Sequence, residues 1–163
     1  MQAKKERIET AALVAEIVGA IAVVISVIYL AAQIAESNKE LRSQTHFNAL
    51  TLGQRPLEIE LGNGELASII NRGYAGPGQL TEDEWYRFTQ YQVIAINAWE
   101  YYFYEKNKGS LPLYLWTGAN AYYEKLIKTK PGLRQFWQEN GHIYAEPFHS
   151  YVDNIIDSAT TSD

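Results

Sequence analysis

Two Glu-x-x-His spacings contain the residues of this chain best suited to bind a metal ion. Glu139 is followed by His142, and Glu146 by His149, at the i, i+3 spacing with which helical bundles build di-metal centres. A further carboxylate, such as that of Glu100, would be needed to complete such a centre. The spacing therefore raises the hypothesis of a helical-bundle metalloenzyme.

The local sequence argues against both pairs as metal ligands. Gly141 ends a predicted helix before His142, while Glu146 and Pro147 begin the next one. Neither pair then lies within a helix, although the ligands of a di-metal site must share a helix face. We interpret these residues as helix caps and loop polar groups, predict no metal ligand and no cofactor, and keep the metalloenzyme as an alternative.

Glu100 is the side chain with the best prospect of acid–base chemistry. It lies between Trp99 and Tyr101 in the most apolar soluble helix, where burial would raise the pKa of its carboxyl group. The competing interpretation is that Lys, Arg or Tyr partners satisfy it. His46 fits a solvated position.

Nucleophilic catalysis and phosphate binding find little support in the sequence. The chain has no cysteine, and none of Ser26, Ser68 and Ser150 lies in a Gly-x-Ser-x-Gly context. The glycines around Gly76 follow no predicted strand and precede no Gly-Lys-Ser/Thr, so they indicate a turn. We therefore predict no catalytic residue.

Composition limits the classes of partner. The 163 residues carry a formal net charge of -5, which does not favour nucleic acid as a partner. Aromatic residues make up 13% of the chain, and most of them lie beyond residue 84. They must form a core or a contact surface, because aromatic side chains gain most from burial.

One segment is long and apolar enough to cross a membrane. Residues 11–35 read AALVAEIVGAIAVVISVIYLAAQIA, and at about 1.5 Å per residue they span the roughly 30 Å hydrocarbon layer. A cleaved signal peptide and a buried soluble helix are the alternatives, but the apolar run is longer than a usual signal sequence and no small-x-small site follows it cleanly. We predict a retained anchor.

The charges that flank this segment indicate its orientation. Lys4, Lys5 and Arg7 precede it, and Lys39 and Arg42 follow it, so the excess of positive charge on the N-terminal side is a single residue. By the positive-inside rule the N-terminus is then cytoplasmic. The prediction is a bacterial inner-membrane protein with one span and its soluble domain outside the cytoplasm.

The first part of the span carries a pattern suited to helix association. Ala11, Ala15 and Gly19 form a stripe of small residues that lets two helices approach closely, and Glu16 lies beside it. In one interpretation Glu16 snorkels to the interface, where the helix dipole also favours it. In the other, copies of the chain form a ring in which Glu16 faces the lumen of a pore.

The remaining sequence predicts an all-α protein. A stalk over residues 36–62 continues the spanning helix until Pro56 ends or kinks it, and a bundle over residues 63–157 follows. Thr81 and Glu84 form a capping box that begins the central helix. The predicted helices of the bundle cover residues 65–74, 81–108, 113–128, 133–140 and 147–156, between a basic flank at residues 1–10 and a polar tail at residues 158–163.

The central helix carries more aromatic residues than one helix face can bury. Some side chains of the run Trp99, Tyr101, Tyr102, Phe103 and Tyr104 must meet another surface. That surface is a neighbouring helix of the same bundle, a protein partner, the membrane interface, or a ligand or pigment in a pocket. We keep these interpretations and name the five residues as possible protein-contact residues.

Several patterned segments together resemble a known set of proteins. They are IVGAIAVVISVIYLAAQIAESN, GELASIINRGYAG, LTEDEWYRF, WEYYFYEKNKG and KPGLRQFWQENGHIYAEPFHSYVD. The chain resembles a widespread set of uncharacterised bacterial single-pass membrane proteins with an N-terminal transmembrane helix and a helical soluble domain. It differs from them in having Ala35 and Glu36 where a basic residue is expected. The resemblance implies no activity.

The sequence as a whole favours a non-catalytic, membrane-anchored interaction module. Its expected partners are the lipid bilayer and either further copies of the chain or other membrane proteins. The alternatives are a homo-oligomeric pore lined by Glu16 and the metalloenzyme described above.

Overall fold

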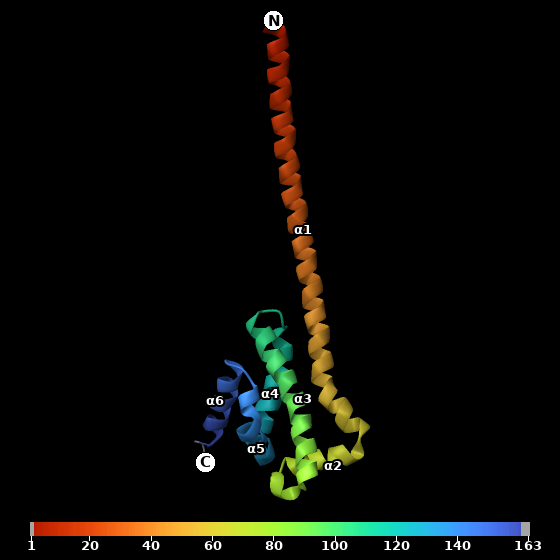
Figure 1. The fold of residues 1–163 in the computed structure, drawn as a ribbon, viewed down its shortest axis with the longest axis vertical. Helices are drawn as coiled ribbons and strands as arrows, with labels where there is room; N and C mark the ends of the chain where they lie inside the picture. Colours follow the sequence, from red (N-terminus) through yellow and green to blue (C-terminus); the bar gives the residue numbers. More distant parts are fainter. Residues whose placement is uncertain (1, 161–163) are drawn as a thin grey trace. The chain divides into compact units, whose positions relative to one another are not determined.

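The computed structural model of the chain describes residues 2–160, which form two units, residues 2–43 and residues 44–160. Every regular element in this range is a helix, so the protein is all-α, as predicted (Figure 1). The helices are α1 Gln2–Gly62, α2 Gly64–Gly73, η1 Pro77–Gln79, α3 Glu82–Asn107, α4 Leu113–Thr129, α5 Pro131–Asn140, η2 Gly141–Ile143 and α6 Phe148–Thr160.

The first unit consists of the N-terminal part of α1. All its described side chains are exposed, including the large apolar ones between Leu13 and Ile34. By length and composition this helix could cross a membrane. Exposure of an apolar surface of this kind to water is unfavourable.

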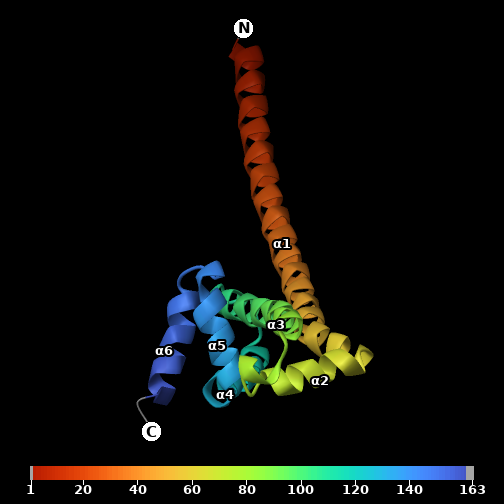
Figure 2. The same ribbon diagram turned by 60° about the horizontal axis from the view of Figure 1, so that its bottom comes forward.

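The second unit is a bundle built around α3. The buried side chains come from every neighbouring helix: Ile69 from α2, Phe88, Ile96 and Trp99 from α3, Ile127 from α4, Phe136 from α5 and Phe148 and Val152 from α6. Burial of each stabilises the fold by about 1.5–3 kcal/mol. Within this unit α6 lies at the opposite edge from α2 (Figure 2).

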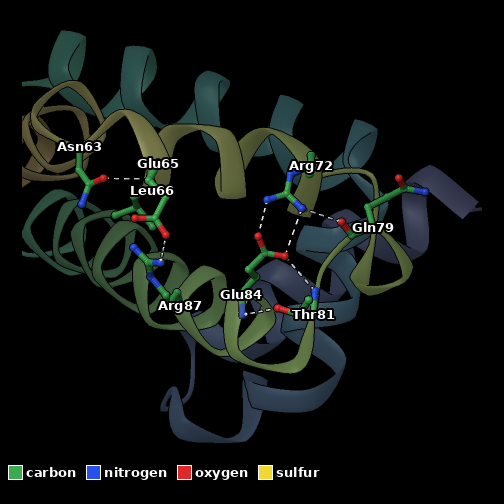
Figure 3. Close-up of polar contacts among 8 residues, drawn as sticks. All are labelled: Asn63, Glu65, Leu66, Arg72, Gln79, Thr81, Glu84 and Arg87. Carbon is green, nitrogen blue, oxygen red and sulfur yellow. Dashed lines mark hydrogen bonds and ion pairs between the residues drawn. The ribbon is translucent and has the colours of Figure 1, made fainter.

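Local polar contacts fix the ends of α2 and α3. The Thr81 hydroxyl accepts a hydrogen bond from the Glu84 amide, and the Glu84 carboxylate accepts one from the Thr81 amide, which confirms the predicted capping box. The same carboxylate binds the Arg72 guanidinium of α2 at 2.6 Å (Figure 3). Arg87 of α3 binds Glu65 of α2 at 2.6 Å, so two ion pairs join these helices.

The predicted stalk divides between the two units. The helix runs through Pro56 to Gly62 rather than ending at the proline, and from residue 44 onward it belongs to the bundle. Ala49 and Pro56 are buried there, and the Ala49 carbonyl accepts a hydrogen bond of 2.7 Å from the Tyr102 hydroxyl. The bundle therefore begins within the segment expected to be a stalk, because side chains on one face of α1 pack against it.

The other bounds differ from the predictions by a few residues. The helix expected over residues 147–156 begins at Phe148 and continues to Thr160, so the first residues of the expected polar tail are helical. Residues 161–163 of that tail lie outside the described range. Helix ends depend on capping and packing as well as on local preference, which explains small differences of this kind.

Candidate functional site

The residues predicted to associate helices all lie on the exposed first unit. Ala11, Ala15, Glu16 and Gly19 are exposed, and a Cβ added to Gly19 would meet no atom within 4 Å. At 3.6 residues per turn, Ala11, Ala15 and Gly19 fall on one side of α1. The face is available to a partner, and its use for association stays a prediction.

A tyrosine-lined cavity lies within the second unit. Its volume is about 330 Å³, and it is bounded by the bundle part of α1, by α3 and by α4. Leucine, proline and alanine side chains form much of the wall. The tyrosines that line it are Tyr74, Tyr91, Tyr102, Tyr114, Tyr122 and Tyr123. A concave, mostly apolar pocket with a few polar groups is the usual form of a small-molecule site.

Hydroxyl groups make one part of this cavity polar. The Tyr91 hydroxyl donates a hydrogen bond of 3.3 Å to the Glu60 carboxylate. Burial raises the pKa of Tyr74 to about 12, and the nearby Tyr122 and Glu60 contribute to the rise. Burial likewise raises the pKa of Tyr91 and of Tyr122. These phenols keep their protons at physiological pH, so the cavity offers hydrogen bonds rather than a phenolate nucleophile.

Two glycines border the cavity for different reasons. A Cβ on Gly53 would overlap the Tyr102 hydroxyl, so close packing explains this glycine. A Cβ on Gly118 would meet no atom within 4 Å, although Gly118 lies inside α4, where glycine costs about 1 kcal/mol relative to alanine. Packing within the protein does not explain Gly118.

The aromatic run of α3 is divided between core and surface. Trp99, Tyr102 and Phe103 are buried, and Trp99 stacks on Tyr123 at 5.3 Å between ring centroids. Tyr101 and Tyr104 are only partly exposed. The bundle itself therefore covers Trp99, Tyr102 and Phe103. Of the five residues, this leaves Tyr101 and Tyr104 for a contact with a protein partner.

The histidines of the two Glu-x-x-His pairs, His142 and His149, line one pocket with Asp153, but Glu139 and Glu146 do not line it. The Glu139 carboxylate accepts hydrogen bonds from Trp85 and Gln135, and His142 lies in η2 rather than in α5. No group of three His, Asp or Glu side chains among residues 2–160 is placed to hold a metal ion. The physical reason is the helix break at Gly141, which separates Glu139 from His142.

Glu146 and His149 both make contacts with nearby residues of α6. The Glu146 carboxylate accepts a 2.8 Å hydrogen bond from the Ser150 hydroxyl, and His149 Nδ1 lies 3.2 Å from the Asp153 carboxylate. The imidazole of His149 also stacks on Trp137. These contacts describe the first turns of α6, where polar side chains satisfy one another.

Glu100 and His46 have the surroundings of structural residues. Burial raises the pKa of Glu100, while a backbone hydrogen bond from Ala145 lowers it. The carboxyl group is half-buried and does not line the cavity. His46 is partly exposed, and its ring forms an edge-to-face pair with the Tyr114 ring, with 6.4 Å between the ring centroids.

The residues that line the cavity could not be predicted from the sequence. Its walls come from segments far apart in the chain, and no local motif links Tyr74 with Tyr122. The sequence contains two signals: the excess of tyrosine, and the position of Gly118 inside the helix predicted over residues 113–128. Neither shows which side chains meet.

Comparisons with known proteins identify no relative of this chain. No protein-family model, no curated protein and no solved structure matches the chain. The resemblance to bacterial single-pass membrane proteins therefore remains a prediction from the sequence.

Proposed function

We propose that this protein is a non-catalytic interaction module anchored in the bacterial inner membrane by one helix. The module associates with further copies of itself or joins a larger membrane assembly. In this proposal residues 11–35 of α1 cross the bilayer and the helical bundle lies outside the cytoplasm, as the one-residue excess of positive charge before the span favours.

The exposed apolar surface of the first unit is the observation that carries this proposal. Between Leu13 and Ile34 every Val, Ile and Leu side chain of the helix is more than half exposed. A patch of this extent marks a surface that another phase or another protein covers. Lipid covers most of such a helix, and a partner helix covers the side where small residues allow close approach.

Two carboxylates of α3, those of Glu84 and Glu105, have structural contacts that support a non-catalytic role for these groups; Glu100, whose pKa is raised by burial, is not among them. Glu84 is held by Arg72 between α2 and α3, and Glu105 is held by Lys108 and Ser110 at the end of α3. The pKa of each carboxyl group is lowered in this arrangement. Such groups are ionised structural partners and are not poised to exchange a proton near neutral pH.

A matched pair of substitutions tests association through the small-residue face. Ala15→Ile places a branched side chain on the face of Ala11 and Gly19, whereas Ala20→Ile makes the same chemical change about 140° around the helix. We expect the first variant to shift the protein towards monomers and the second to leave its assembly unchanged. The measurement is the mass of the full-length protein in lipid nanodiscs, together with energy transfer between labelled copies in vesicles.

Two outcomes would contradict the proposal. If the wild-type chain remains monomeric and binds no other membrane protein, the proposed interaction role is wrong. If the full-length protein is found in the soluble fraction after gentle lysis, the proposed membrane anchor is wrong.

A further inference from the structure

We infer that the tyrosine-lined cavity of the bundle binds a small apolar molecule that carries one hydrogen-bond-donating group, an alcohol or an amine. This inference goes beyond the anchoring role and does not depend on whether copies associate. It rests on the volume and lining of the cavity, on the polar groups at Tyr91 and Glu60, and on Gly118.

The cavity has the size and surface of a ligand site. Its volume of about 330 Å³ falls within the range of small-molecule pockets, and its wall is mainly aromatic rings and aliphatic side chains. The cavity is open to solvent on one side, where its lining side chains Leu50, Leu57, Tyr114 and Tyr122 are 40–65% exposed. An apolar occupant would remove this aromatic and aliphatic surface from water.

The polar groups of the cavity select the head group of the occupant. The Tyr91 hydroxyl already donates its proton to Glu60, so its oxygen is left to accept a hydrogen bond. The Tyr102 hydroxyl is used by the Ala49 carbonyl and holds α1 in place. Glu60 itself does not line the cavity, but its carboxylate lies 3.3 Å from the Tyr91 hydroxyl oxygen. The region near Tyr91 therefore offers an acceptor beside a carboxylate, which favours a donor and disfavours an anionic head group.

Gly118 gives a second and independent indication of a ligand. It is exposed within α4 at the edge of the cavity, and no atom of residues 2–160 lies within 4 Å of a Cβ built there. A glycine allows the close approach of a ligand to the backbone at such a point. The loss of helix stability caused by glycine is then offset by the access that it gives a ligand to the cavity.

Three compounds with one skeleton test the inference on the full-length protein in nanodiscs. They are 3-phenylpropan-1-ol, 3-phenylpropylamine and 3-phenylpropanoate, which differ only in the head group. We expect saturation-transfer NMR to show binding of the alcohol and the amine, with the carboxylate at least about tenfold weaker because of its repulsion from Glu60. Empty nanodiscs correct for partition into lipid.

Variants at adjacent positions locate the binding. Gly118→Leu fills the open space and is expected to abolish binding, whereas Gly118→Ala raises helix propensity and keeps binding. Thr117→Leu is the matched control, because Thr117 is exposed on the same helix and does not line the cavity. Thermal unfolding confirms that each variant is folded.

Three results would overturn the inference. They are the absence of binding by all three compounds, equal binding of the carboxylate and the alcohol, and unchanged binding in a folded Gly118→Leu protein. Because the head-group series uses the wild-type chain, it decides the question even if a variant fails to fold. A wild-type chain that stays monomeric, or an Ala15→Ile protein that still associates, would contradict the proposed function and leave these binding results unaffected, so the two proposals fail separately.

Discussion

At the scale of single residues, the Arg72–Glu84 pair shows how one side chain serves two structural purposes. The Glu84 carboxylate caps α3 at Thr81 and binds Arg72 of α2 (Figure 3). The arginine hydrogen bond, the largest contribution, lowers the pKa of Glu84 to about 2. Since 41% of the Arg72 side chain and 26% of the Glu84 side chain are exposed, water screens part of this interaction.

The protonation of Glu84 makes stability depend on pH. Its pKa is lower in the folded protein than in the unfolded chain, so its contribution is fully present above about pH 4.5 and is lost as the pH falls towards 2. We expect the melting temperature of the wild type to fall over this window more steeply than that of Glu84→Gln. Thermal unfolding between pH 2 and pH 7 measures both. Parallel curves would show that the pair does not stabilise the fold.

Gly132 lies where two backbone segments pack closely together. Its amide donates a hydrogen bond of 3.0 Å to the Tyr74 carbonyl, and a Cβ at this position would overlap the Gly73 carbonyl oxygen. We expect Gly132→Ala to destabilise the bundle by about 2–3 kcal/mol, because the backbone must shift. Gly64→Ala is the control, since a Cβ there meets nothing within 4 Å. Denaturant unfolding that gave equal stabilities would refute this account.

At the scale of elements, a small polar network joins α3, α4 and α6. The Asn120 side-chain oxygen accepts hydrogen bonds from Trp99 Nε1 at 2.9 Å and from the Tyr151 hydroxyl at 2.8 Å, and its amide donates to Glu124. Trp99 is fully buried, so its indole N–H depends on this acceptor. The network therefore specifies how three helices pack, in addition to the apolar core around them.

Removal of the shared acceptor tests this network. We expect Asn120→Ala to lower the free energy of unfolding by about 2 kcal/mol, because the buried Trp99 donor loses its partner. Asn154→Ala is the comparison, since Asn154 is exposed and its side-chain amide donates a hydrogen bond to the Ser150 carbonyl of its own helix. Chemical denaturation of both variants provides the measurement. A change within about 0.5 kcal/mol for Asn120→Ala would mean that water replaces the lost group.

At the scale of the whole molecule, the protein combines an exposed apolar helix with a bundle that has its own core. The two units obey different physical requirements. The first needs an apolar environment to cover it, while the second buries its apolar side chains by itself. A function that depends on the surface of the first unit can thus be separated experimentally from one that depends on the cavity of the second.

A charge in the middle of the apolar segment tests the proposed span. We expect Val23→Arg to reduce the fraction of chain inserted in membranes, since an arginine at the centre of a spanning helix costs about 3 kcal/mol. Ile8→Arg lies before residues 11–35 and is expected to leave insertion unchanged. Extraction of membranes with alkaline carbonate measures the inserted fraction. Equal insertion of the two variants would show that this segment does not lie across the hydrocarbon layer.

Local features of the sequence were sufficient to predict the helices. The apolar run of residues 11–35, the capping box at Thr81 and the breaks at Gly109 and Gly141 act on neighbouring residues. Hydrogen bonds between near neighbours decide where such helices begin and end. The all-α class and the bounds of the central helix therefore agree with the structure to within a few residues.

Contacts between distant segments were decided only by the tertiary structure. It buries Trp99, Tyr102 and Phe103 within the bundle, attaches residues from 44 onward to that bundle, and brings Tyr74, Tyr91 and Tyr122 to one cavity. Helical periodicity shows which residues share a face, but it does not show which faces meet. The sequence by itself thus determined the elements and the apolar segment, while the packing of those elements determined the core, the boundary and the cavity.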